Sequence, residues 1–204
     1  MENRRLGKKF DRQAVLFEQE RKLGLLNKWR EKLIPFAHGG VLELAVGAGG
    51  NLPFYQKGVD VTAFDISFSM LEKAEVVAKQ RGLDVSFILG NAETICFKQN
   101  QFDTVVSTLF FCGYDDPVRM LKRALYWLKP GGTLLLLEHG ISESQKIALI
   151  QNKVDPLAKH IIGCHQNRPM MNMIRALPIK VDIHESFAKG IFHVVKGTSL
   201  KSLR

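Results

Sequence analysis

Residues 41–55 read VLELAVGAGGNLPFY, the part of the sequence that bears most directly on the fold. A run of apolar residues carries one acid, Glu43, and then breaks into a loop with glycines at positions 47, 49 and 50. The Rossmann fingerprint G-x-G-x-x-G also follows an apolar strand, and its glycines let a ligand approach the backbone closely. The stretch therefore raises the question of which ligand lies against these glycines.

Short apolar runs alternate with helical patterns after this stretch. Strands are expected at 40–46, 58–65, 84–89, 102–110 and 131–140, and helices at 67–82 and 115–129. Ser67 and Asp116 are candidate helix N-caps, and Gly82 ends the first of these helices. Strands that are apolar on both faces and alternate with helices indicate a parallel sheet with helices on both faces.

The end of the chain follows a different pattern. Residues 179–186 and 190–199 read as two strands whose short connection permits only an antiparallel hairpin. The predicted fold class is therefore α/β, a Rossmann-like seven-stranded, mostly parallel sheet with a C-terminal antiparallel hairpin. Between residues 143 and 177 lies a helical, Met-rich stretch with Pro156, Gly163 and Pro169 as expected breaks.

Two segments are predicted along the chain. Residues 8–34 are amphipathic and almost free of helix breakers, so residues 1–35 are expected to form a helical arm that covers the ligand cleft as a lid. Phe10 and Phe17 are expected to face inward from it. Residues 36–204 are expected to form the main domain, because 204 residues suffice for one domain with a real core.

Composition narrows the functional class. The longest apolar run, TLLLL at 133–137, is far too short to span a membrane, and the N-terminus is too polar for a secretory signal. Cys96, Cys112 and Cys164 are widely spaced and form no CxxC pair, so they are interpreted as plain thiols, and no metal site is expected. These features predict a cytoplasmic protein.

Positive charge gathers at both ends of the chain. Residues 1–35 hold 10 Lys and Arg against 5 Asp and Glu, and residues 140–204 hold 10 against 4. Residues 36–139 hold 9 against 11. Such asymmetry indicates either an anionic partner or simply a basic surface.

The glycine loop does not complete the dinucleotide fingerprint. Counted from Gly47, its third glycine would fall at position 52, where this chain has Leu52. Asp65 nevertheless ends the second strand, where a carboxylate can accept hydrogen bonds from a ribose diol. The combination favours a nucleoside that carries a small charged tail instead of phosphates.

The ordered set VLELAVGAGGNLPFY, VTAFDISFSMLEKA, FILGNAETICF and FDTVVSTLFFCGYDDPVRMLKRALYWLKPGGTLLLLEH resembles the class I S-adenosylmethionine-dependent methyltransferases. It is most similar to the branch with quinone C-methyltransferases, phospholipid N-methyltransferases and methyltransferase-like thiol methyltransferases. The resemblance covers about residues 8–200 and implies S-adenosyl-L-methionine as cofactor. The cofactor-binding residues that it implies are Glu43, Gly47, Gly49, Asp65, Ile66, Met70, Asn91, Ala92, Thr108 and Leu109.

These residues carry separate expected roles. Gly47 and Gly49 are expected against the methionine part, Asp65 at the ribose hydroxyls, and Ile66 and Met70 near the adenine. Asn91 and Ala92 would face the adenine edge, and Thr108 and Leu109 would close the cleft. The family often has Gly-Cys where this chain has Ala45-Val46.

The resemblance also implies an acceptor side. The segments LEHG and GCHQNR place His139 as a candidate base and Arg168 as a candidate partner for an anionic head group. A satisfied structural histidine and a surface arginine are the alternatives. Phe110, Phe111, Tyr114, Met170, Met171 and Met173 are read either as an apolar acceptor pocket or as core.

The predicted function is methyl transfer to a small apolar or lipid-like acceptor. The alternative is a cofactor-binding module without turnover, since the sequence proves no catalytic base. The fourth strand lacks the Asn/Asp-Pro-Pro-aromatic motif of amide methyltransferases, so nucleic acid is not an expected partner. The two basic segments suggest peripheral, salt-sensitive contact with an anionic membrane.

Overall fold

The computed structural model describes residues 2–202, with side chains from residue 7 onward, so residues 1, 203 and 204 of the predicted segments lie outside the description. The helices are α1 (Glu2–Leu23), α2 (Asn27–Leu33), α3 (Phe68–Arg81), α4 (Pro117–Trp127), α5 (Gln145–Ile161) and α6 (Met170–Arg175). The strands are β1 (Gly40–Leu44), β2 (Asp60–Asp65), β3 (Val85–Leu89), β4 (Phe102–Thr108), β5 (Leu128–His139), β6 (Ile179–Phe187) and β7 (Phe192–Ser199). Three short 3₁₀ turns are η1 (Ile34–Phe36), η2 (Leu52–Phe54) and η3 (Phe111–Gly113).

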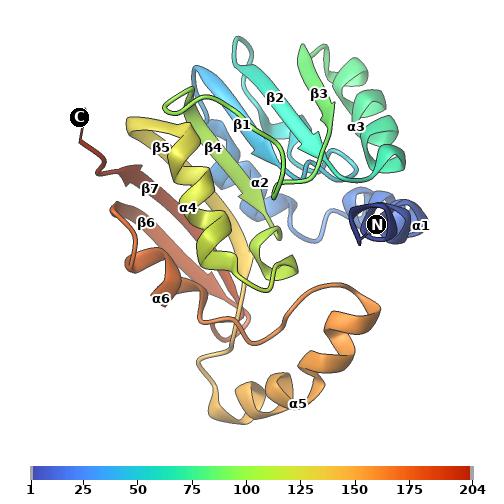
Figure 1. Ribbon diagram of the computed structural model, residues 1–204, viewed down its shortest axis with the longest axis vertical. Coiled ribbons are helices and arrows are strands. Elements are labelled where there is room, and N and C mark those ends of the chain that lie inside the picture. The colour runs from blue at the N-terminus through green and yellow to red at the C-terminus, as the bar shows by residue number, and fades with distance from the viewer. Residues whose placement is uncertain (1, 203–204) are drawn as a thin grey trace.

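All seven strands form one sheet, in the order β3-β2-β1-β4-β5-β7-β6 (Figure 1). The pairs among β1 to β5 are parallel, whereas β7 pairs antiparallel with both β5 and β6. The predicted α/β sheet with a C-terminal antiparallel hairpin is confirmed. The strand order reverses between β1 and β4, and ligands of open α/β sheets bind at such a switch point, beyond the carboxyl ends of the strands.

Local signals fix the ends of the helices that flank the sheet. The Ser67 hydroxyl accepts a hydrogen bond from Met70 N at 3.2 Å and begins α3, and Gly82 ends it in the left-handed conformation. The Asp116 side chain accepts from Arg119 N at 2.9 Å and begins α4. All three predicted caps are confirmed.

The core consists of two layers, one on each face of the sheet. Successive residues of β1 point to opposite faces, so Val41 packs with α2 and α3 while Leu42 packs with α4 and α6. Both layers are continuous across the strands, which explains why the parallel strands read as unbroken apolar runs.

Helices α1 and α5 lie beyond the ends toward which the parallel strands point (Figure 1). The expected break at Pro156 is wrong, because α5 continues through that residue to Ile161. A proline leaves the carbonyl four residues earlier without its helical partner, and Asn152 at that position is exposed, so water can satisfy it. The chain then turns at Gly163, with φ +95°, as predicted.

Candidate functional site

Asp65 stands at the carboxyl end of β2 and fixes the glycine loop. The Gly47 N–H donates to Asp65 Oδ2 and the Ser67 N–H donates to Asp65 Oδ1, each at 2.9 Å. Burial raises the pKa of the Asp65 carboxyl to about 6, although both N–H groups act in the opposite direction. A carboxylate held in this way has lone pairs left for a ligand hydroxyl pair.

The glycines of the loop have different structural roles. Gly47 has φ +55°, and a Cβ built on it would meet nothing nearer than the Ala45 carbonyl oxygen at 4.0 Å. A ligand therefore has open space beside this backbone. A Cβ on Gly49 would lie 3.1 Å from the Ala74 Cα, so this glycine lets the loop pack against α3. The predicted contact of Gly49 with the methionine part stays a prediction.

Glu43 lies beneath the loop in a buried hydrogen-bonded group. The Asn51 amide donates to Glu43 Oε1 at 3.0 Å, and the Tyr55 hydroxyl donates to Oε2 at 2.8 Å. Burial raises the pKa of Glu43 to about 7, against these two hydrogen bonds and the charge of buried Arg30. The Arg30 guanidinium in turn packs against Gly50. The geometry assigns Glu43 to holding the loop in place, and its predicted contact with the cofactor is untested.

The residues predicted near the adenine surround the same strand ends. Asn91 is buried, its side-chain oxygen accepts from Glu93 N at 2.9 Å, and Ala92 packs into the core. Ile66 is half-buried, whereas Met70 is buried against Ala14 and Ala48. Their placement is compatible with an adenine pocket, but it also satisfies core packing.

Thr108 and Leu109 end β4 beside the loop. The Asn51 amide bonds the Thr108 hydroxyl at 3.0 Å, which links β4 to the group around Glu43. Leu109 has φ +55°, a conformation that a leucine rarely adopts. Strained backbone of this kind clusters at functional sites. β4 therefore ends beside the glycine loop, where Thr108 and Leu109 were predicted to close the cleft.

Comparison with known proteins identifies this arrangement. Residues 42–136 match the family described as methyltransferase domain. A demethylmenaquinone methyltransferase of Renibacterium salmoninarum is 34% identical over 122 residues, which are 57% of this chain and 49% of that protein. The thiol S-methyltransferase TMT1B of Rattus norvegicus is 36% identical over 135 residues, which are 63% of this chain and 54% of that protein.

Residues 42–136 therefore form a methyltransferase domain, and the chain is similar to S-adenosylmethionine-dependent methyltransferases. It spans about half the length of the curated relatives it matches. A chain with the same fold occurs in a solved structure described as a complex between the Haloferax volcanii Trm112 methyltransferase activator and the putative methyltransferase, with a TM-score of 0.73 at 18% identity over 97% of this chain and 99% of that one.

The cofactor of the family, S-adenosyl-L-methionine, fits the site. Asp65 supplies a buried hydrogen-bond acceptor at the end of β2. In the loop that Asp65 holds, the backbone of Gly47 has open space beside it for a ligand. Leu52 stands where a dinucleotide fingerprint has the glycine that lets a helix N-terminus bind a pyrophosphate, and the Arg30 guanidinium packs on Gly50. The site suits a nucleoside with a short zwitterionic tail.

Helix α1 lies beside the cofactor loop. Asp11 Oδ1 accepts from the Ser67 hydroxyl at 2.6 Å and from Ser69 N at 3.2 Å. Lys73 and Glu18 form an ion pair at 2.5 Å. These contacts tie α1 to the N-terminal half of α3, directly after Asp65.

The aromatic residues of α1 face the same way. Phe17 packs against Met70 and Ala48, and its ring lies 6.5 Å from the ring of Phe10. Phe10 also approaches Gly163, which follows α5. The predicted inward direction is confirmed for Phe17, and α1 therefore reaches from α3 to the end of α5.

The opposite side of the site, here called the acceptor side, consists of η3, the end of β5 and residues 140–168. Glu138 is buried; its Oε1 accepts from the Ser107 hydroxyl at 2.6 Å and from Phe110 N at 3.0 Å. Its other oxygen has no hydrogen-bond partner among the described residues. Burial raises the pKa of Glu138 to about 7. His139 follows, buried at the end of β5 as predicted.

Arg168 also lies on the acceptor side, but its guanidinium is engaged. Its Nη2 donates to the carbonyls of Tyr114 and Asp115, each at 3.1 Å. These bonds hold the segment after η3, so the structure favours a positioning role. The predicted pairing with an anionic head group stays a prediction.

The candidate apolar pocket is mostly core. Phe110, Phe111, Met170 and Met171 are buried in the layer that packs on α4, and only Tyr114 and Met173 are partly exposed at its edge. This is the alternative that the sequence left open.

Helix α5 has inverted faces: it packs against the protein with polar residues and exposes apolar ones, the reverse of an ordinary surface helix. Its inner face carries Gln151, whose amide donates to the carbonyls of Gly140 and Gln166 at 3.0 and 2.9 Å and whose oxygen accepts from Ser142 N at 2.8 Å. Asp155 accepts from Gln166 N at 2.6 Å. The polar face thus fixes the loops on either side of the helix.

The outer face of α5 carries the apolar residues. Ile150, Val154, Leu157 and Ile161 follow one another at helical spacing, and Leu157 and Ile161 are 60% and 58% exposed. The sequence shows this stripe, but not which side of it faces the protein. Sequence reasoning therefore missed Gln151 and Asp155, as it missed the buried partners Asn51 and Tyr55 of Glu43.

The acceptor side also brings two cysteines together. The Cys112 thiol, in η3, lies 3.1 Å from the Cys164 sulfur, in the loop after α5. The hydrogen bond from Cys112, and then the neighbouring His139, lower the pKa of Cys164. The sequence interpreted both as plain thiols because 52 positions separate them.

Proposed function

We propose that this protein transfers the methyl group of S-adenosyl-L-methionine to a small, apolar acceptor that it takes from an anionic membrane surface. The cofactor supplies an electrophilic methyl group on a sulfonium. The acceptor must approach that methyl group in line, and alignment with exclusion of water can contribute about 7–11 kcal/mol to lowering the barrier. His139 is proposed to stand nearest the acceptor, at the carboxyl end of β5.

The observation that carries the proposal is the stripe of Ile150, Val154, Leu157 and Ile161 on α5. A surface helix normally exposes its polar face and buries its apolar face. Here the apolar face points to solvent on a helix that lies beyond the carboxyl ends of the strands (Figure 1). An apolar helix face next to the cleft suits insertion into the head-group region of a bilayer.

Basic residues beside the stripe support the same proposal. A groove of about 370 Å³ lies between α1 and the end of α5, lined by Lys8, Lys9, Arg12, Gln13 and Ile161. Within residues 2–202, no helix is both long and apolar enough to cross a bilayer. Attachment would therefore be peripheral, with each cation near an anionic surface contributing about 1 kcal/mol.

We also propose that α1 acts as a lid on the cofactor cleft. Its contacts through Asp11 and Phe17 lie next to Asp65, and Lys9 Nζ donates to the His160 carbonyl at 2.9 Å on the far side. Bound cofactor would then hold α1 closed. Trypsin should cut at Arg12 or Arg21 more slowly when S-adenosylhomocysteine is present, and equal rates would argue against a lid.

The cofactor is tested by binding. S-Adenosylhomocysteine should raise the melting temperature, as any ligand specific for the native state does. Asp65→Ala should weaken binding by about 1.5–3 kcal/mol, because it removes a charge-assisted hydrogen bond. Asp60→Ala, an exposed acid on the same strand, is the control. Stabilisation by NADH but not by S-adenosylhomocysteine would contradict the proposed function.

The membrane step is tested with vesicles. The double variant Leu157→Glu/Ile161→Glu should bind anionic vesicles at least about tenfold more weakly, because two apolar contacts are lost. Val76→Glu, at a 54% exposed site on α3, should bind as the unchanged protein does. Negligible binding to anionic vesicles at low salt would disprove the membrane step and leave cofactor binding untouched.

Turnover separates this function from a binding module. Labelled S-adenosyl-L-methionine is incubated with quinols, apolar thiols and phospholipids in vesicles. Transfer of label to one acceptor class supports the enzyme. Tight cofactor binding without transfer to any class would support the binding module instead.

A further inference from the structure

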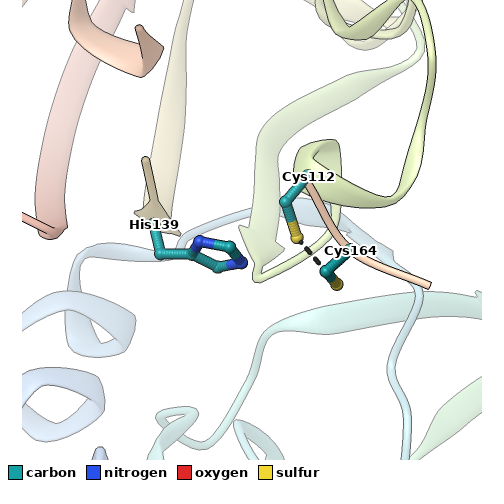
Figure 2. Close-up of side chains that lie close together, drawn as sticks. All are labelled: Cys112, His139 and Cys164. Atoms are coloured by element: carbon teal, nitrogen blue, oxygen red, sulfur yellow. Dashed lines mark hydrogen bonds between the residues drawn. The ribbon is translucent and has the colours of Figure 1, made fainter. Parts of the chain in front are cut away.

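Three potential metal ligands converge on the acceptor side from three separate elements. Cys112 comes from η3, His139 from the end of β5, and Cys164 from the loop after α5, as Figure 2 shows. One ligand atom from each residue lies within 4.8 Å of the other two. Cys112 and His139 are buried and Cys164 is half-buried.

The surrounding structure holds the two cysteine-bearing segments against each other. The His165 N–H, one residue after Cys164, donates to the Cys112 carbonyl at 2.9 Å. Lys159 Nζ donates to the Gly113 carbonyl, one residue after Cys112, at 2.8 Å. The backbone on either side of the sulfur pair is therefore fixed by bonds that do not involve the sulfurs.

Gly113 and Gly163 lie in the two turns that bring the cysteines together. A Cβ on Gly113 would lie 3.8 Å from the Gly163 carbonyl oxygen, so the two turns pass each other in contact. Gly163 has φ +95°, which favours glycine at the turn that presents Cys164. The imidazole of His139 reaches the pair from the opposite side (Figure 2).

We propose that Cys112, His139 and Cys164 bind one zinc ion and leave its fourth position open to the methyl acceptor. Two sulfurs and one imidazole nitrogen form a ligand set that suits zinc, and three protein ligands with one open position are typical of catalytic zinc.

The distances agree with this assignment. At zinc–sulfur distances of about 2.3 Å, tetrahedral geometry sets the sulfurs about 3.8 Å apart. The sulfurs are 3.1 Å apart here, so metal binding would need a shift of a few tenths of an ångström in each side chain. A disulfide would need them about 1 Å closer and would leave the approach of His139 without a role.

The open position specifies the acceptor further, and this part rests on the proposed function. An acceptor with an ionisable S–H or phenolic O–H would bind zinc through that atom and release its proton to solvent. The bound sulfur or oxygen then keeps a lone pair for the methyl carbon. His139 acts here as a metal ligand, so it would not also serve as the base.

The test begins with reduced, metal-free protein titrated with Zn²⁺ against a chromophoric chelator. Equimolar binding is expected, with release of thiol protons into a weak buffer. Loss of an outer-shell partner alone weakens zinc sites about 10–100-fold, so Cys112→Ser, Cys164→Ser and His139→Asn should each weaken binding by at least about 100-fold. Cys96→Ser, at the exposed cysteine, should bind like the unchanged protein.

Co²⁺ gives a readout that is independent of activity. Thiolate-to-cobalt absorption should appear in the unchanged protein and in Cys96→Ser, and should fall in both other cysteine variants. Added thiophenol or phenol should shift the cobalt spectrum, and the one that does so identifies sulfur or oxygen as the bound atom. If neither thiophenol nor phenol changes the cobalt spectrum, the proposed open fourth position is overturned.

Other outcomes overturn the metal site itself. No Zn²⁺ binding by the reduced protein, or equal binding by all variants, would do so. Ready oxidation of Cys112 with Cys164 in a protein that binds no Zn²⁺ would assign the pair to a disulfide instead. The melting shift with S-adenosylhomocysteine is measured on the same samples. If that shift fails while zinc binds, the proposed function falls and the metal site stands.

Discussion

The two sides of the cleft are built in opposite ways. On the cofactor side, Asp65 and Glu43 each accept hydrogen bonds from residues at most 18 positions away in sequence. On the acceptor side, Cys112 meets Cys164 across 52 positions, and Gln151 joins loops on both sides of α5. The two acids of the cofactor side are thus held by near neighbours, although Asn51 also bonds Thr108 across 57 positions, whereas the sulfur pair depends on the convergence of distant segments.

This contrast indicates where the specificity for the cofactor and the specificity for the acceptor reside. A loop stabilised by its own neighbours can hold the same cofactor in proteins with different acceptors. The acceptor side depends on one helix, α5, and can therefore change without disturbing the cofactor loop. Substitutions on the inner face of α5 should therefore affect the acceptor side more than the cofactor loop, and the first prediction tests that separation.

The largest expected effect is that of Gln151→Leu. The apolar side chain would leave Ser142 N and the carbonyls of Gly140 and Gln166 without their partner, at a cost of about 2–4 kcal/mol in unfolding free energy. Ile150→Gln, the neighbouring exposed position, should change stability by less than about 0.5 kcal/mol. Urea denaturation measures both, and equal losses would contradict the inverted orientation of α5.

The shift with S-adenosylhomocysteine separates the two sides in the same variant. If α5 is independent of the cofactor loop, Gln151→Leu keeps the melting shift of the unchanged protein. Loss of that shift would show that the two sides are coupled.

A smaller effect is expected from pH. Glu43 and Glu138 have pKa values raised to about 7 by burial, above their values in the unfolded chain. The folded protein therefore binds more protons between pH about 4.5 and 7, so stability should fall as pH rises through that range. Each group should contribute on the order of 1–3 kcal/mol.

Single variants divide this pH effect between the two sides. Glu138→Gln and Glu43→Gln should each flatten part of the slope, whereas exposed Glu93→Gln should not. Denaturation at pH 5, 6, 7 and 8 gives the slopes. Stability that rises across this range would contradict the burial of both carboxylates as the dominant cause.

The smallest expected effect is a gain from Ala45→Gly. Ala45 has φ +49°, where an L-residue costs about 1 kcal/mol and glycine does not. The substitution should stabilise the protein by about 0.5–1 kcal/mol. Ala63→Gly, in the interior of β2, should destabilise it instead. Midpoints of urea denaturation at constant slope decide, and a loss in Ala45→Gly would mean that the loop does not adopt this conformation in solution.

The sequence predicted the sheet because its signals are local. Apolar runs, the Ser67 and Asp116 caps and the acid that ends β2 all act within a few residues, and each was found in place. The hydrogen bonds within residues 43–55 were missed, although they are local, because Asn51 and Tyr55 show no periodic pattern.

The acceptor side could not be predicted in the same way. A stripe at helical spacing indicates an amphipathic helix but not the direction of its faces, so Gln151 and Asp155 read as surface residues. Cysteines 52 positions apart carry no signal of proximity without a fold. The proline at position 156 removes one helical hydrogen bond and crowds the carbonyl four residues earlier, but it does not end the helix here.

If α5 attaches the protein to a membrane as proposed, its exposed stripe also determines how rates should be measured. An enzyme held at an interface meets its acceptor at a two-dimensional density, not at a bulk concentration. Adding acceptor-free vesicles or micelles would dilute the acceptor within the surface and slow the reaction, although the amount per volume is unchanged. Rate constants from detergent and from vesicles should then agree only when acceptor is expressed as a mole fraction of the surface.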